Sequence, residues 1–239
     1  MKIAIMQPQY FPWPGYFELY LACDKFVFLD HVQLVKGFTN RVQIKSSQGS
    51  KWLTIPIKKQ KSYLPIDMTI SNDELMWGQK HKNQLIESYK DAPYYGQVMD
   101  IFENFLEHKN NNISDIAKLS VSQILKFLGI YLDSKIIHSS DLGINSSKSD
   151  LIFEIVRKLE GTSYITGKGG INYLDHDKFS DNGVEIFYMD YRMSEYRQLH
   201  GPFNPFVSIL DMIANNGGRI DLIESPKVLH WRSYIFDER

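Results

Sequence analysis

The first 17 residues contain a group of side chains suited to binding a nucleotide or a sugar. Gln7, Tyr10, Trp13 and Tyr16 offer amide, phenol and indole groups, which hydrogen-bond to or stack on planar rings. Gly15 allows a ligand to approach the backbone where a helix is expected to begin, and N–H groups at a helix start favour phosphate. The stretch QPQYFPWPGYF is neither a Walker loop nor a G-x-G-x-x-G fingerprint.

A second group of polar residues follows the expected strand at 26–29. Asp30 and His31 come directly after it, at the end of a strand where open α/β sheets bind ligands, and either could act as a general base. The guanidinium group of Arg41 can bind phosphate or carboxylate through two parallel hydrogen bonds. The expected substrate-binding residues of this segment are Gln33, Lys36, Asn40, Arg41 and Lys45.

Two later segments add candidates for substrate binding. In SYITGKGGINYLD, Gly167 and Gly169 let the backbone approach a ligand at a strand-to-helix turn, and Lys168 adds positive charge. In HGPFNPFVSILDMIANNG, Ser208 and Asp211 lie on an expected helix that could face the site. The structural alternative is that the aromatic residues fill the core, the charged residues are solvated, and Ser208 starts the helix.

Other kinds of chemistry have little support in the sequence. The seven histidines lack metal-ligand spacing, so no metal site is expected, and the single Cys23 excludes an intramolecular disulfide. There is no G-x-S-x-G elbow for a serine nucleophile.

The elements that must position these residues predict an α/β fold. Short apolar strands at 3–6, 26–29, 135–138, 163–166 and 184–188 alternate with helices at about 15–23, 149–159 and 171–179. This alternation predicts a Rossmann-like, mainly parallel sheet with helices on both faces. A β-hairpin extension is expected at 41–45 and 52–57. We expect one domain over 1–239, with Rossmann-like parts at about 1–60 and 130–215 and a helical insertion at about 70–130. The segment after Asn215 is expected to be irregular.

Composition limits the function classes. Lys plus Arg number 27 and Asp plus Glu 28, so the formal net charge of −1 does not predict a nucleic-acid sequence reader. No apolar run approaches the roughly 20 residues that span a bilayer, and no signal peptide is evident. We therefore expect a cytoplasmic protein without membrane insertion; a homo-oligomer is compatible with the sequence.

The motifs together resemble the WbqC-like protein family over nearly the whole chain. The resemblance is carried by the first 45 residues, by WLTIPIKK, by the segment from Trp77 to His81, by SYITGKGGINYL and by FNPFVSILDMIANNG. The matching positions are Gln7, Pro8, Tyr10, Pro12, Trp13, Gly15, Tyr16, Asp24, Asp30, Gln33, Asn40, Arg41, Gly167, Ser208, Asp211 and Gly217. The resemblance implies work in bacterial O-antigen and surface-polysaccharide biosynthesis, on nucleotide-activated sugars.

Three functions follow as hypotheses. The first is a transferase that acylates or aminoacylates the amine of a nucleotide-linked amino sugar, with an acyl or aminoacyl donor as second partner. The second is an adenylate-forming ligase that uses ATP with magnesium. Its basis is a distant similarity to nucleotidyltransferases, with residues 146–149 near the phosphates, although Trp13-Pro14-Gly15-Tyr16 stands where those enzymes carry H-x-G-H. The third is a non-catalytic partner of glycan-assembly enzymes.

Overall fold

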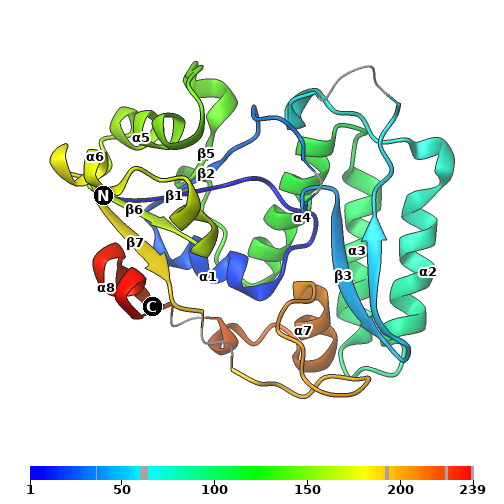
Figure 1. Cartoon of the computed structure of the whole chain (residues 1–239). Helices are drawn as coiled ribbons and strands as arrows, with labels where there is room; N and C mark the ends of the chain where they lie inside the picture. Colours follow the sequence, from blue (N-terminus) through cyan, green and yellow to red (C-terminus); the bar gives the residue numbers. More distant parts are fainter. Residues whose placement is uncertain (36, 60–63, 192–193, 224–225, 238–239) are drawn as a thin grey trace.

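A six-stranded sheet forms the centre of the protein in a computed structural model that describes residues 1–35, 37–59, 64–191, 194–223 and 226–237 (Figure 1). The strand order is β5-β2-β1-β6-β7-β8, in which β8 runs antiparallel to β7 and the other neighbouring strands are parallel. The strands are β1 (Lys2–Met6), β2 (Lys25–Phe28), β5 (Ile136–His138), β6 (Ser163–Thr166), β7 (Glu185–Met189) and β8 (Val228–His230). The predicted α/β fold with a mainly parallel sheet is confirmed.

Alternation along β1 explains why the sheet is covered on both faces. Ala4 packs into one apolar cluster together with side chains of α1 (Pro14–Ala22), whereas Ile3 and Ile5 belong to a second cluster with α5 (Lys148–Lys158) and α6 (His176–Asp181). Successive side chains of a strand point to opposite faces, so a central parallel strand must be apolar on both. All three of these β1 residues are buried.

A β-hairpin and several helices form the other half of the molecule. The hairpin consists of β3 (Arg41–Ser46) and β4 (Gly49–Thr54), and Gly49 has a φ of +97° at the turn. Figure 1 shows α2 (Trp77–Tyr89) and α3 (Tyr95–His108) beside this hairpin, with α4 (Ile113–Phe127) nearer the sheet. The helix α7 (Ile209–Asn216) packs against α3 and β3. Short 3-10 helices lie at Ile66–Met68, Asp73–Leu75, Asp133–Lys135, Ser139–Leu142, Lys168–Asn172 and Ile220–Leu222.

The structure differs from the sequence-based expectation in three segments. The second hairpin strand, expected at 52–57, is β4 at Gly49–Thr54. The helix expected at 171–179 is a 3-10 helix, Lys168–Asn172, followed by α6, because the Asp175 carboxylate caps a new helix by accepting from the Lys178 N–H at 3.1 Å. The C-terminal segment is not merely irregular. It contributes β8, which pairs with β7, and α8 (Trp231–Asp237). A three-residue strand has too little periodicity to be recognised without its partner.

The order of the strands creates a crevice at one edge of the sheet. From β1 the chain proceeds to β2 on one side, whereas β6 and β7 lie on the other side of β1. The strand order therefore reverses between β1 and β6. In open parallel sheets, ligands bind at the carboxyl ends of the strands at such a reversal.

Candidate functional site

A pocket with a volume of about 720 Å³ lies at this reversal point. It opens at the carboxyl ends of β1, β6 and β7, which end at Met6, Thr166 and Met189. Five aromatic side chains dominate the wall. The lining residues are Met6, Gln9, Trp13, Tyr16, Gly167, Lys168, Met189, Asp190, Tyr191, Pro205, Phe206 and Tyr234. We call it the aromatic pocket.

Trp13 forms one wall of the aromatic pocket because Gly15 leaves room for its ring. A Cβ at position 15 would lie 2.3–2.7 Å from three atoms of the Trp13 ring, closer than any normal contact. The ring meets Tyr191 edge-on with centroids 4.8 Å apart, and Phe206 at 5.8 Å. Phe206 is 65% exposed. An exposed aromatic wall of this kind suits stacking against a planar or sugar ring.

A smaller pocket of about 270 Å³ adjoins the aromatic pocket and shares Met6, Gln9 and Gly167 with it. Gln7 and Gly169 also line it. The glycine-rich turn after β6 therefore faces both cavities, and a Cβ at Gly170 would lie 2.9–3.3 Å from three neighbouring side chains. The structure thus brings together seven of the predicted site residues: Gln7, Trp13, Gly15, Tyr16, Gly167, Lys168 and Gly169.

A buried carboxyl group lies behind the aromatic wall, and the sequence analysis missed it. Glu18 is only 7% exposed on α1, and burial raises its pKa to about 7. Burial is also the main cause that raises the pKa of Tyr191, and the negative charge of Glu18 adds to it. A single carboxylate inside the apolar helix PGYFELYLA was the available signal.

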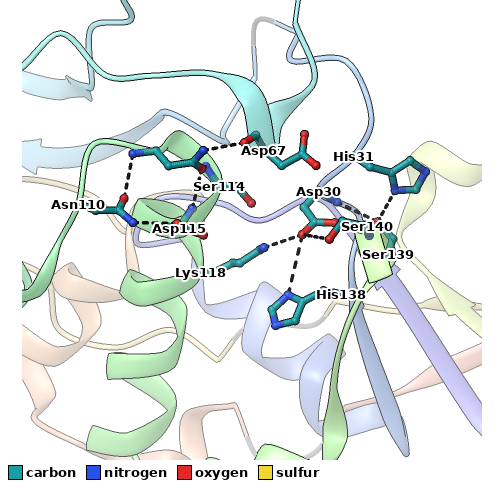
Figure 2. A network of polar contacts seen from close by, with 11 residues as sticks. Asp30, His31, Asp67, Asn110, Ser114, Asp115, Lys118, His138, Ser139 and Ser140 are labelled. Atoms are coloured by element: carbon teal, nitrogen blue, oxygen red, sulfur yellow. Dashed lines mark hydrogen bonds and ion pairs between the residues drawn. The ribbon is translucent and has the colours of Figure 1, made fainter. Parts of the chain in front are cut away.

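Asp30 lies at the carboxyl ends of β2 and β5, apart from the residues that line the aromatic pocket, and is fully buried. Figure 2 shows Lys118 of α4 directed at it, with the Nζ 2.5 Å from Oδ2. The Ser139 hydroxyl and the Ser140 N–H each donate to Oδ1 at 2.9 Å. Burial alone would raise the pKa of Asp30, but Lys118 and the serine donors outweigh it and lower the pKa. A carboxylate held ionised in this way is a weak base, so Asp30 fits a structural ion pair.

His31 belongs to the same network but faces a different cavity. Its Nδ1 is 2.6 Å from the Ser139 Oγ, and because that hydroxyl donates to Asp30, we assign the proton to Nδ1. Nε2 is then an acceptor, and it is buried without a hydrogen-bond partner in the described part of the chain. His31 and Gln33 line a pocket of about 470 Å³ together with residues 144–148 and Leu151.

The predicted binding residues of the hairpin segment are engaged elsewhere. Asn40 donates to the Ile55 carbonyl at 2.8 Å. Arg41 donates to the Gly37 carbonyl at 3.1 Å and stacks on Trp52, 4.2 Å from the ring centroid. Lys45 is buried, and its Nζ donates to Gln198 at 2.8 Å and to two backbone carbonyls. None of the three lines the aromatic pocket. Lys36 lies outside the described residues.

Ser208 and Asp211 lie in the core rather than in the aromatic pocket. The Ser208 hydroxyl donates to the Phe11 carbonyl at 2.7 Å and accepts from the Leu210 N–H, which caps α7. Asp211 is fully buried and accepts from the Tyr196 hydroxyl at 3.1 Å. Burial raises the pKa of Asp211 to about 6, although tyrosine hydroxyls and Lys45 favour its ionised form. The Ser208 contacts agree with the alternative that this residue starts the helix, whereas Asp211 is neither solvated nor part of the aromatic pocket.

Tyr10 is also fully buried and connects the first loop to α2. Its hydroxyl lies 3.0 Å from Nδ1 of His81, and Nε2 of His81 lies 3.2 Å from the Thr54 carbonyl. A carbonyl only accepts, so Nε2 carries the proton and Tyr10 donates to Nδ1. Burial lowers the pKa of His81 to about 4, which keeps the ring neutral. Tyr10 therefore lies outside the stacking wall formed by Trp13 and Phe206.

The described residues contain no group of three or more His, Cys, Asp or Glu side chains placed to hold a metal ion. The part of the chain that the structure describes has no helix with the length and apolarity needed to cross a membrane.

Comparison with known proteins identifies the family. A model of the WbqC-like protein family matches residues 7–220, a range that includes the residues of both adjoining pockets except Ile5, Met6 and Tyr234. The chain belongs to the WbqC-like protein family. It is 30% identical over 234 residues to "Uncharacterized protein Rv1507c" of Mycobacterium tuberculosis (strain ATCC 25618 / H37Rv), an alignment that covers 96% of this chain and 98% of that protein. No solved structure shows significant similarity to this WbqC-like chain.

Proposed function

We propose that this WbqC-like protein is a transferase of bacterial surface-polysaccharide (O-antigen) biosynthesis that acylates or aminoacylates the amine of a nucleotide-linked amino sugar. The observation that carries the proposal is the aromatic pocket at the reversal point of the sheet, continuous with a glycine-rich turn. Aromatic walls suit a nucleobase or sugar ring, and a glycine-rich turn after a parallel strand suits a diphosphate.

Each part of the pocket has a role in this proposal. Trp13 and Phe206 stack against the base or sugar, while Lys168 and the backbone of the turn at residues 167–169 hold the diphosphate. The sugar amine attacks the acyl carbonyl carbon of the donor, the new C–N bond forms, and the donor's carrier group leaves with the bonding electrons. The amine must lose a proton in this step. That proton passes to solvent water, because Glu18, the nearby carboxyl with a pKa of about 7, lies behind the wall and lines neither pocket.

A calorimetric titration with UDP- and TDP-linked amino sugars tests the binding half of the proposal. We expect Trp13→Ala to weaken binding about 5- to 150-fold, because stacking on one aromatic ring is worth about 1–3 kcal/mol. Phe38→Ala is a matched control, since Phe38 is an exposed aromatic outside the pocket. Equal loss in both variants, or no binding by the unmodified protein, would contradict the proposal.

The transfer half is tested by mass spectrometry of the sugar after incubation with acyl and aminoacyl donors. A mass gain on the sugar, with release of the donor's carrier, supports it. Binding of every sugar without any transfer points instead to a non-catalytic partner of glycan-assembly enzymes.

The ATP-dependent ligase is a second candidate because of the pocket at His31. That cavity is lined by Ser146, Ser147 and Lys148 at the start of α5, together with the unpartnered Nε2 of His31. Hydroxyl and ammonium groups of this kind suit a phosphate chain. Titration with ATP and magnesium separates the candidates: binding lost in Lys148→Ala and retained in Trp13→Ala favours the ligase.

A further inference from the structure

The charges of the chain are distributed very unevenly along the sequence. Residues 31–66 contain seven basic residues and no Asp or Glu. The basic residues are Lys36, Arg41, Lys45, Lys51, Lys58, Lys59 and Lys61. The rest of the chain therefore has 27 − 7 = 20 basic residues against 28 acidic ones. Lys45 is buried, Lys36 and Lys61 lie outside the described residues, and Lys51 pairs with Glu87, so Arg41, Lys58 and Lys59 give this segment its basic surface.

Exposed apolar side chains gather in the same part of the molecule. Twelve large hydrophobic residues are exposed in the described part of the chain, and seven of them lie between positions 35 and 76. Five of these form what we call the apolar face: Phe38, Trp52, Ile57, Leu75 and Met76. Met76 is 66% exposed. Single exposed hydrophobic residues are common, but a cluster of them marks an interaction surface.

Contacts link three residues of the apolar face, and Ile57 and Met76 are chain neighbours of residues in these contacts. Phe38 and Trp52 have ring centroids 5.9 Å apart, and Trp52 and Leu75 line one cavity of about 260 Å³ together with Pro56. The Asn72 N–H donates to the Pro56 carbonyl at 2.7 Å, which brings the start of α2 to the end of the hairpin. Figure 1 shows the hairpin strand β3 on the opposite side of the molecule from β7. The aromatic pocket opens at the end of β7.

Cations surround the apolar face. Lys58 and Lys59 are exposed directly after Ile57, Lys80 lines the cavity, and Arg41 stacks on Trp52. The nearby Asp73 is neutralised by Lys109, with a distance of 2.7 Å between Nζ and Oδ2. Glu74 is an exposed acid beside the face.

We infer that the apolar face is a docking surface for an anionic lipid bilayer. Aromatic and aliphatic tips enter the interface between headgroups and acyl chains, while lysine and arginine side chains pair with lipid phosphates. The apolar residues Ile57, Leu75 and Met76 argue against a nucleic acid as the partner. A nucleic acid would contact basic and aromatic groups but would leave these three side chains in water. Docking of this kind is peripheral and requires no membrane-spanning helix.

Flotation with lipid vesicles tests this inference with the whole chain. We expect binding to vesicles containing phosphatidylglycerol, little binding to pure phosphatidylcholine, and release by 0.5 M salt, which screens surface charge. Leu75→Asp/Met76→Asp and Lys58→Glu/Lys59→Glu should each weaken binding at least tenfold, and Glu74→Lys should strengthen it. All changed residues are exposed. Circular dichroism is used to check that each variant is folded.

Two control variants make the outcome decisive. Leu132→Asp changes an exposed apolar residue elsewhere, and Lys90→Glu/Lys126→Glu reverses two exposed charges elsewhere; both should bind vesicles like the unmodified protein. No binding to phosphatidylglycerol vesicles at low salt, or equal loss in control and test variants, overturns the inference. Binding of single-stranded RNA instead of vesicles, lost in the lysine variant, would show that the surface recognises nucleic acid.

Discussion

At the scale of single residues, the candidate site depends on a small residue beside a large one. Trp13 reaches its position in the pocket wall because its ring lies over Gly15, where no Cβ fits. Glu18, on the same helix, is buried behind that wall and is the only charged residue of α1. Both residues can be tested by minimal substitutions.

We expect Gly15→Ala to displace the Trp13 ring and weaken nucleotide-sugar binding at least tenfold. The added methyl group should also lower the free energy of unfolding by about 1–3 kcal/mol, as overpacking commonly does. Titration calorimetry and denaturant unfolding measure the two effects. Gly96→Ala on α3 is the control, since nothing lies within 4 Å of a Cβ there. Unchanged binding by Gly15→Ala would show that the Trp13 wall is not part of the site.

Glu18 should make stability fall as the pH rises. Its pKa is 4.5 in the unfolded reference and about 7 in the folded protein, so between these values the folded protein binds more protons. The free energy of unfolding should therefore decrease across this window, by on the order of 3 kcal/mol. Glu18→Gln should remove this decrease, and we would compare denaturant unfolding at pH 5 and pH 8.

The informative quantity is the difference in pH dependence of the free energy of unfolding between the unmodified protein and Glu18→Gln. The raised pKa of Asp211, about 6, gives a slope of the same sign in both. Glu107→Gln changes an exposed carboxylate on α3 and should retain the full pH dependence. A Glu18→Gln variant that keeps the same dependence as the unmodified protein would refute the assignment.

At the scale of elements, the Asp30 network holds the helical half against the sheet. Asp30 follows β2, Ser139 and Ser140 follow β5, and Lys118 projects from α4 (Figure 2). The peptide N–H of Asp67 also donates to the Asp30 carbonyl at 3.1 Å. Three separate parts of the chain thus meet at one buried carboxylate.

Asp30→Asn should lower the free energy of unfolding by about 3–5 kcal/mol, because it leaves the Lys118 charge without its buried partner. The variant should keep its affinity for nucleotide sugars at a temperature where it is folded. Asp141→Asn, an exposed neighbour on the 3-10 helix after β5, should change stability by less than about 0.5 kcal/mol. Unchanged stability together with lost transfer in Asp30→Asn would instead indicate a catalytic role.

At the scale of the whole molecule, sequence periodicity was enough to predict the layers but not the convergence of the site. The strands β1, β2 and β6, which begin at Lys2, Lys25 and Ser163, were predicted to within one residue. Each of them is a short apolar run between clear breaks. The reversal between β1 and β6 became visible only in the strand order of the structure. The loop at Trp13 and the turn at Gly167 were each expected from local sequence, and the structure brings them to adjoining pockets.

The other half of the predicted site illustrates what local patterns leave undetermined. Lys45 and Asp211 look like binding residues in the sequence, but they are buried near each other between the hairpin and α7. Whether a polar side chain faces a ligand or a distant carbonyl depends on long-range packing. Tyr191, Phe206 and Tyr234 were missed for the same reason, since they approach Trp13 only through the fold.

A crystal structure of the protein soaked with a TDP- or UDP-linked amino sugar tests the central claim most directly. We predict the base or sugar stacked against Trp13 and Phe206, with the diphosphate beside residues 167–170. Density for the ligand in the His31–Lys148 cavity, or an empty aromatic pocket at saturating ligand, would contradict the account.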